Sequence, residues 1–80
     1  MKEAYLRNLT PGQIRYCLNM ASMYPGCWRA MVLSAAKRAV GAHPTAVGLI
    51  RRISFQGLMA LTLPDLREAL STHTQEVSHG

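Results

Sequence analysis

The chain has 80 residues, of which 49% are hydrophobic, and a formal net charge of +5. This length allows one small domain, which buries only about 60% of its unfolded surface and gains stability from a partner or a second copy. The longest uncharged run, residues 16–28, is too short to span a bilayer, and the first residues lack the apolar stretch of a secretory signal. We therefore expect a cytoplasmic protein without a transmembrane segment.

The charged residues are unevenly distributed along the sequence. Residues 4–64 contain no Asp or Glu, whereas a segment of this length ordinarily carries roughly seven acids. The same segment contains the cations Arg7, Arg15, Arg29, Lys37, Arg38, Arg51 and Arg52. Cations without neighbouring acids repel one another and attract an external polyanion. The composition favours a nucleic acid, an acidic protein or an anionic membrane surface as the partner.

The first strong helix signal begins at Thr10, after a possible helical turn within residues 1–8. Thr10 and Gln13 have the spacing of a capping box, and Pro11 stands at the first helical position, where its missing N–H costs nothing. Leu9 and Ile14 occupy the two positions of a hydrophobic staple. The helix then has an apolar stripe at helical spacing, formed by Ile14, Cys17, Leu18 and Ala21.

The dipeptide at 25–26, Pro-Gly, ends this helix. A second helix is predicted over 27–40, with one face formed by Trp28, Met31, Val32, Ala35 and Ala39. Lys37 and Arg38 fall in its last turn, where cations interact favourably with the helix dipole, and Gly41 is the natural residue after its end.

A third helix is predicted to open at residues 43–45, with the inward stripe Ala46, Leu49, Ile50 and Ile53. Gly57 weakens its continuation towards Leu61. Thr62 and Asp65 repeat the capping pattern and begin a last helix that is expected to end near Ser71. Together these signals predict an all-α bundle of three to four short helices over residues 1–71, followed by a disordered polar tail over 72–80.

Residues 35–53 resemble the helix-turn-helix of bacterial transcription regulators. Ala35 and Ala36 match the small pair that lets the two helices approach, and residues 50–53, Ile-Arg-Arg-Ile, match the end of the recognition helix. The resemblance implies a DNA-binding regulator, working as a dimer on two half-sites. It would place His43, Thr45 and Gly48 near bases, with the phosphates held by Lys37, Arg38, Arg51 and Arg52.

Residues 29–58 show a second likeness, to the C-terminal end of insertion-sequence transposases. It rests on the Ala-Ala-Lys-Arg run at 35–38, on Pro44 and on the Ser-Phe-Gln-Gly run at 54–57. The likeness implies a remnant without catalysis, since no acid lies between Glu3 and Asp65.

A protein partner is the alternative to DNA. The chain would then be a small helical adaptor or inhibitor, of the kind that phages and mobile elements encode, binding an acidic host protein. Tyr24, Trp28, Arg29 and Met31 are the candidate contacts, because Trp, Tyr, Met and Arg are enriched at interfaces. Trp28 itself is more typical of a core. Binding to a membrane surface is a third alternative, through the helix at 27–40.

Enzymatic chemistry is not expected. Asp65 and Glu68 are three residues apart near a helix beginning, where carboxylates complement the helix dipole. Cys17 and Cys27 do not have the spacing of a zinc site with any His, and lone cysteines of this kind are most often buried thiols. We predict no metal, no cofactor and no catalytic residue.

Overall fold

The computed structural model describes the backbone of residues 2–38 and 43–79 and the side chains of 3–38 and 43–73. This part of the chain forms no strand and five helices: α1 (Lys2–Asn8), α2 (Pro11–Met23), α3 (Trp28–Lys37), α4 (Pro44–Ala60) and α5 (Leu63–His79). The all-α prediction is confirmed, and α1 is a whole helix where one turn was expected. No helix in the described ranges is both long enough and apolar enough to cross a membrane.

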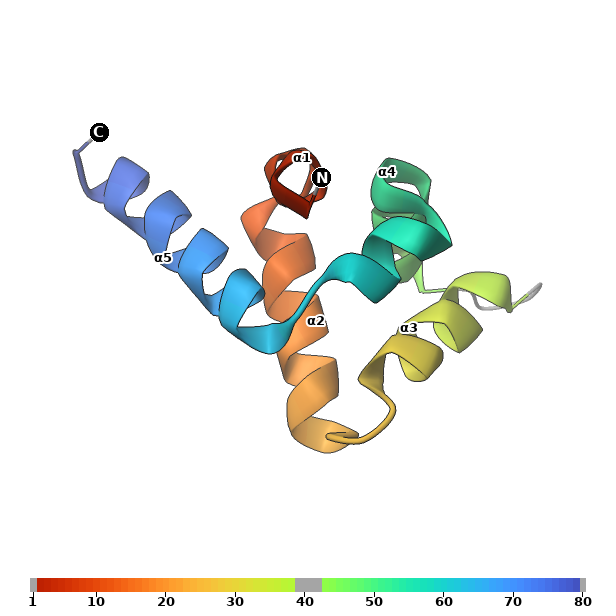
Figure 1. Ribbon diagram of the computed structural model, residues 1–80. Helices are drawn as coiled ribbons and strands as arrows, with labels where there is room; N and C mark the ends of the chain where they lie inside the picture. Colours follow the sequence, from red (N-terminus) through yellow and green to blue (C-terminus); the bar gives the residue numbers. More distant parts are fainter. Residues whose placement is uncertain (1, 39–42, 80) are drawn as a thin grey trace.

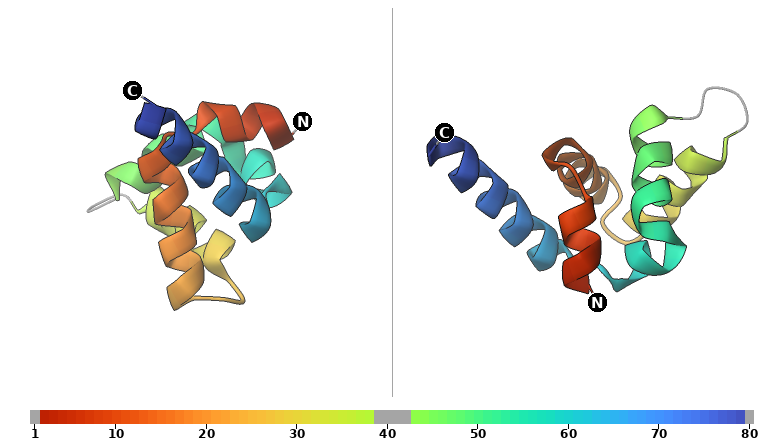
Figure 2. Two further views of the ribbon diagram at one scale, coloured as in Figure 1. Left: turned by 90° about the vertical axis from the view of Figure 1, so that its left-hand side faces the viewer. Right: turned by 90° about the horizontal axis from the view of Figure 1, so that it is seen from above.

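Helix α2 lies at the centre of the fold. It packs against α5 on one side and against α3 and α4 on the other, while α1 lies against α4 and α5 (Figures 1 and 2). Figure 1 shows α5 leading away from the other helices towards its C-terminal end. The stripes predicted from helical spacing meet in one core, whose fully buried side chains include Ile14, Cys17, Val32, Leu49, Ile53 and Leu66.

Both predicted helix caps are present. The Thr10 hydroxyl accepts the Gln13 N–H at 3.1 Å, and the Gln13 side-chain oxygen accepts the Thr10 N–H at 3.0 Å. At the beginning of α5, the Thr62 hydroxyl accepts the Asp65 N–H at 3.4 Å and the Asp65 carboxylate accepts the Thr62 N–H at 3.2 Å. Each pair satisfies two N–H groups that lack partners within the helix.

Helix α4 is interrupted at Ser54, which has φ 60° and ψ 177°. The Ser54 hydroxyl accepts the Gly57 N–H at 3.4 Å and so caps a separate last segment over residues 55–60. Sequence had pointed to Gly57 as the weak position. The structure instead packs Gly57 closely, since a Cβ there would lie 2.9 Å from the Tyr5 ring of α1.

Two predicted helix ends differ from the structure. Helix α3 ends at Lys37 rather than at residue 40, and Gly41 lies outside the described residues. Helix α5 does not end near Ser71 but continues to His79, because no Pro or Gly interrupts residues 65–79. The backbone over 72–79 is therefore helical in the structure, and the disorder expected for residues 72–80 stays a prediction.

Candidate functional site

A pocket of about 360 Å³ opens between α2 and α3, and we call it the α2–α3 pocket. Its lining combines three methionines and two tyrosines with one arginine and one histidine: Tyr16, Asn19, Met20, Met23, Tyr24, Met31, Ser34, Ala35, Arg38 and His43. No carboxylate is among these residues. The pocket therefore offers an adaptable apolar surface beside an uncompensated positive charge.

The helix periodicity explains how these residues meet. Tyr16, Met20 and Met23 are spaced i, i+4 and i+7 and share the side of α2 that faces α3. A turn follows, in which the Cys27 N–H donates to the Tyr24 carbonyl oxygen at 3.1 Å. The chain reverses there, and Met31 of α3 comes to the opposite wall of the pocket.

His43 closes the end of the pocket where α4 begins. Its ring stacks on the Tyr16 ring, with 4.7 Å between the centroids and 26° between the planes. Burial raises the pKa of the Tyr16 hydroxyl above its usual value, while the positive charge of Arg38 acts in the opposite direction. Arg38 is thus close enough to this end of the pocket to act on a group there.

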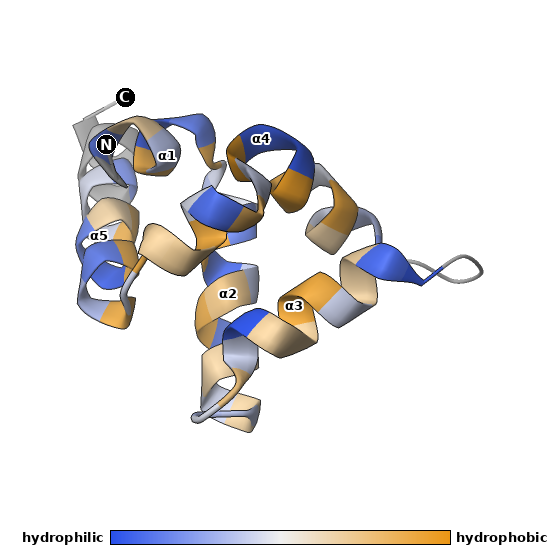
Figure 3. Cartoon of the chain, turned by 45° about the vertical axis from the view of Figure 1, so that its right-hand side comes forward, coloured by the Kyte–Doolittle hydropathy of each residue, from blue (hydrophilic) through white to orange (hydrophobic). Residues whose placement is uncertain are grey.

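Two large apolar side chains of the pocket are open to solvent. Met23 is 56% exposed and Tyr24 is 39% exposed. In Figure 3, apolar segments run along α3 and a hydrophilic segment follows at its end, where Lys37 and Arg38 stand. The exposed apolar side chains thus lie before the beginning of α3, and the cations lie at its other end.

The predicted DNA contacts have different surroundings in the fold. Lys37 and Arg51 are exposed, and His43 and Arg38 line the α2–α3 pocket. Arg52 lies on α4 and donates to the Asn8 carbonyl oxygen of α1 at 3.1 Å. One of the four predicted phosphate contacts therefore already has a partner within the fold.

The two remaining positions on α4 are less open than expected. Thr45 and Gly48 are half-buried. A Cβ at Gly48 would lie 3.3 Å from the side-chain nitrogen of Gln13, so this part of α4 faces α2. The beginning of α4 is covered on that side by a neighbouring helix, whereas a recognition helix requires an open face.

The predicted protein contacts are divided as well. Tyr24 and Met31 lie in the α2–α3 pocket, but Trp28 is only 4% exposed and belongs to the core. Arg29 stacks over the Trp28 ring at 4.8 Å. Its guanidinium also donates to the carbonyl oxygens of Leu58, at 3.3 Å, and Leu61. Trp28 and Arg29 therefore both make contacts within the fold.

Three cations of the acid-free segment thus have backbone acceptors. Arg29 and Arg52 bind carbonyl groups at the C-terminal ends of α4 and α1, and Arg7 donates to the Glu3 carbonyl oxygen at 3.5 Å. For Arg29 and Arg52, the partial negative charge of a helix C-terminus takes the place of an acidic side chain. These three arginines therefore have hydrogen-bond partners within the fold, although no acid is next to them in sequence. Within the described ranges, no hydrogen bond or ion pair is found for Arg15, Lys37, Arg38 and Arg51.

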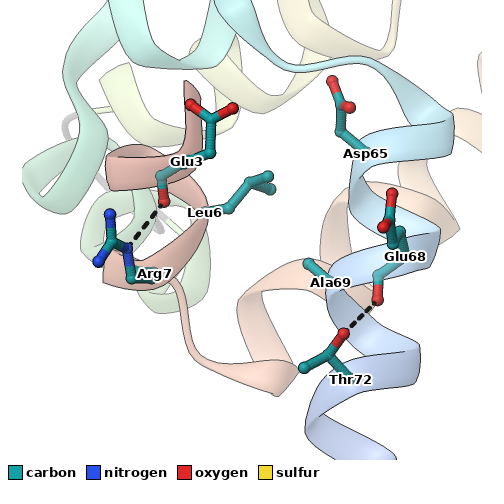
Figure 4. Close-up of a pocket in the computed structure, with 7 residues that line it drawn as sticks. All are labelled: Glu3, Leu6, Arg7, Asp65, Glu68, Ala69 and Thr72. Carbon is teal, nitrogen blue, oxygen red and sulfur yellow. Dashed lines mark hydrogen bonds between the residues drawn. The ribbon is translucent and has the colours of Figure 1, made fainter. Parts of the chain in front are cut away.

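The acidic side chains gather at another place. Glu3 of α1 faces Asp65 and Glu68 of α5 across a groove of about 620 Å³, which Leu6 and Ala69 help to line (Figure 4). This groove shares no residue with the α2–α3 pocket. The fold therefore separates the described acids from Arg38.

Sequence reasoning missed part of the pocket. Tyr16 was not among the predicted contacts, although its i, i+4 and i+7 spacing with Met20 and Met23 is visible beside the apolar stripe. Cys27 was expected to be buried and is exposed, whereas Cys17 is buried as expected. The difference arises because Cys27 lies in the turn before α3, outside the inward stripes.

No model of a protein family matches the chain, and neither the curated proteins nor the solved structures contain a significant match.

Proposed function

We propose that the protein is a non-enzymatic adaptor or inhibitor that binds an acidic partner protein through the α2–α3 pocket. The observation that carries the proposal is the exposure of Met23 and Tyr24 in a pocket that Arg38 also lines and that contains no carboxylate. An acidic protein would bury these exposed apolar side chains, and one of its carboxylates would pair with Arg38.

The residue types support this reading. Exposed Met and Tyr side chains supply contact area, and Met adapts its shape to irregular surfaces. Arg38 is placed to pair with a carboxylate at the edge of the contact, where a guanidinium forms two parallel hydrogen bonds. The carboxylate also steers the partner towards the pocket and excludes basic proteins.

DNA binding through the helix-turn-helix at 35–53 is the second candidate. The observation that favours it is the exposure of Arg51 on α4, with Lys37 and Arg38 at the end of the preceding helix. Such a protein would bind a duplex with a steep salt dependence, in which log K falls by about 0.9 per phosphate contact and per log unit of salt. The covered side of α4 at Gly48 and the engaged Arg52 make this the weaker candidate.

Charge reversal at two exposed arginines separates the candidates. The tagged full chain, its Arg38→Glu variant and its Arg51→Glu variant are used to capture ligands from a lysate of the source organism, with and without nuclease. We expect one acidic protein to be recovered in the presence of nuclease by the full chain and by Arg51→Glu, and to be reduced about tenfold or more by Arg38→Glu.

Arg51→Glu is the matched control, since it makes the same charge change at another exposed arginine. The DNA-binding candidate would replace the proposal if nuclease prevented the recovery of any ligand and if Arg51→Glu also abolished the recovery. A recovered protein that binds all three forms equally would show that the α2–α3 pocket is not its site.

A further inference from the structure

One end of the α2–α3 pocket brings two basic side chains to the same phenol. The His43 ring stacks on the Tyr16 ring, and the positive charge of Arg38 acts on the Tyr16 hydroxyl. His43 and Arg38 therefore meet at one side chain, although Arg38 follows α3 and His43 precedes α4. None of the described residues that line the pocket is a carboxylate.

The imidazole of His43 is open to protonation. His43 is exposed to solvent, and its side chain makes no hydrogen bond that caps the beginning of α4. A cation over the face of an aromatic ring is attracted to it within about 6 Å of the ring centroid, and the two centroids here are 4.7 Å apart. The Tyr16 ring can therefore hold the imidazolium in the same place as the neutral ring.

The other ionisable groups of this pocket keep their charge near neutral pH. Arg38 stays protonated. Burial raises the pKa of Tyr16, so its phenol stays neutral. Tyr24 is a second phenol of the pocket, and residues 39–47 contain no ionisable side chain besides His43. Among the described residues that line the pocket, an imidazole, the group that changes its charge between pH 5 and 8, is found only at His43.

We propose that His43 makes binding at the α2–α3 pocket dependent on pH, so that a proton on its imidazole strengthens the binding of an acidic protein. In the free chain the imidazolium and Arg38 lie in one pocket without a counter-charge. A carboxylate of the partner attracts both cations. The coupling is reciprocal, since a proton that strengthens the binding of the carboxylate is itself bound more tightly when the carboxylate is present. The inference rests on the proposed function, because it requires an acidic ligand at this pocket.

Fluorescein-labelled poly-L-aspartate is the probe for this coupling, because it supplies carboxylates without apolar side chains or imidazoles. Fluorescence anisotropy gives its dissociation constant from the full chain at about pH 6 and about pH 8, where aspartate stays ionised. We expect tighter binding at the lower pH, with about threefold to fivefold of the increase due to His43, the range of an exposed charge pair.

Three histidine variants assign the effect. His43→Gln should lose this part of the increase, whereas His73→Gln, at a histidine of α5 outside the pocket, should retain it. His43→Arg places a permanent cation in the pocket, so it should bind more tightly than the full chain at the higher pH and lose the same part of the pH dependence. Circular dichroism verifies that each variant is folded.

An equal pH dependence of the full chain and His43→Gln would overturn the inference. Arg38→Glu then shows whether the proposed function fails with it. If Arg38→Glu weakens binding at both pH values, the pocket binds carboxylates without a contribution from the proton on His43, and the proposed function stands. If neither Arg38→Glu nor His43→Gln alters binding, the pocket does not attract carboxylates, which contradicts the inference and the proposed function together.

Discussion

At Gly57 the backbone of α4 passes so close to its neighbours that a methyl group has no room. A Cβ at this position would lie 2.8 Å from the Ile53 Cβ and 2.9 Å from the Tyr5 ring. We expect Gly57→Ala to lower the free energy of unfolding by about 1–3 kcal/mol, the usual cost of overpacking, although Ala favours a helix. Urea denaturation measures this change.

Gly26→Ala is the control for this substitution, because nothing lies within 4 Å of a Cβ at Gly26. Its effect should stay within about 0.5 kcal/mol. Equal effects of the two variants would contradict the close packing of α1 on α4.

The Cys17 thiol gives a pH-dependent prediction. Burial raises its pKa to about 12, whereas a thiol in the unfolded chain ionises near pH ~8.5. As the pH rises, the thiol therefore loses its proton in the unfolded chain before it does so in the folded one. The stability due to the neutral thiol is complete below the pKa of the unfolded chain and declines as the pH rises towards 12. The decline is about 1.4 kcal/mol per pH unit within this window.

Urea denaturation in reducing buffer at about pH 8 and about pH 10 measures the decline. Cys17→Ala should remove this part of the pH dependence, whereas Cys27→Ser should retain it, because Cys27 is exposed. A Cys17→Ala variant with the same slope as the parent chain would contradict the assignment to Cys17.

At the scale of the elements, carbonyl groups at the C-terminal ends of helices bind arginines in place of the missing acids. Arg29 is half-buried and makes two hydrogen bonds to the end of α4, while Arg52 is exposed and makes one to the end of α1. Arg29→Met keeps an apolar stem but removes the donors, so we expect a loss of about 2 kcal/mol in the free energy of unfolding.

The exposed arginines give the comparison series. Arg52→Met should cost less than about 1 kcal/mol, and Arg51→Met should stay within about 0.5 kcal/mol. Thermal or urea denaturation of the three variants ranks their losses of stability directly. An Arg29 variant as stable as the Arg51 variant would show that the C-terminal end of α4 does not need its arginine.

Local signals were sufficient to predict the helix beginnings. Thr10 and Thr62 form their caps with residues three positions later, so the spacing of these residues in the sequence is enough to predict the hydrogen bonds. The inward stripes were predictable for the same reason. The all-α class follows from both.

Features that depend on distant contacts were not predictable in this way. Gly57 packs closely against Tyr5, and Arg29 binds the carbonyl oxygen of Leu58; both partners lie far away in the sequence. The candidate site also depends on contacts between residues that are distant in the sequence. Arg38, His43, Tyr24 and Met31 were expected to bind different partners, and only the folded chain shows that they line one pocket.

At the scale of the whole molecule, the described acids lie apart from Arg38. Glu3, Asp65 and Glu68 line the groove between α1 and α5, whereas Arg38 borders the α2–α3 pocket together with exposed methionine and tyrosine. Arg29 and Arg52 are hydrogen-bonded to carbonyl groups at helix ends. The positive charge that remains beside an apolar surface is the basis of the proposed binding of an acidic protein.

Amide chemical-shift mapping tests this claim most directly. The ¹⁵N-labelled full chain is titrated with the purified protein that it captures, and shift changes are followed residue by residue. We predict that the largest changes occur at Tyr16, Met20, Tyr24, Met31 and Arg38 and that they decrease with increasing salt. Changes confined to Thr45, Arg51 and the neighbouring outer side of α4, with the α2–α3 pocket unaffected, would contradict the account.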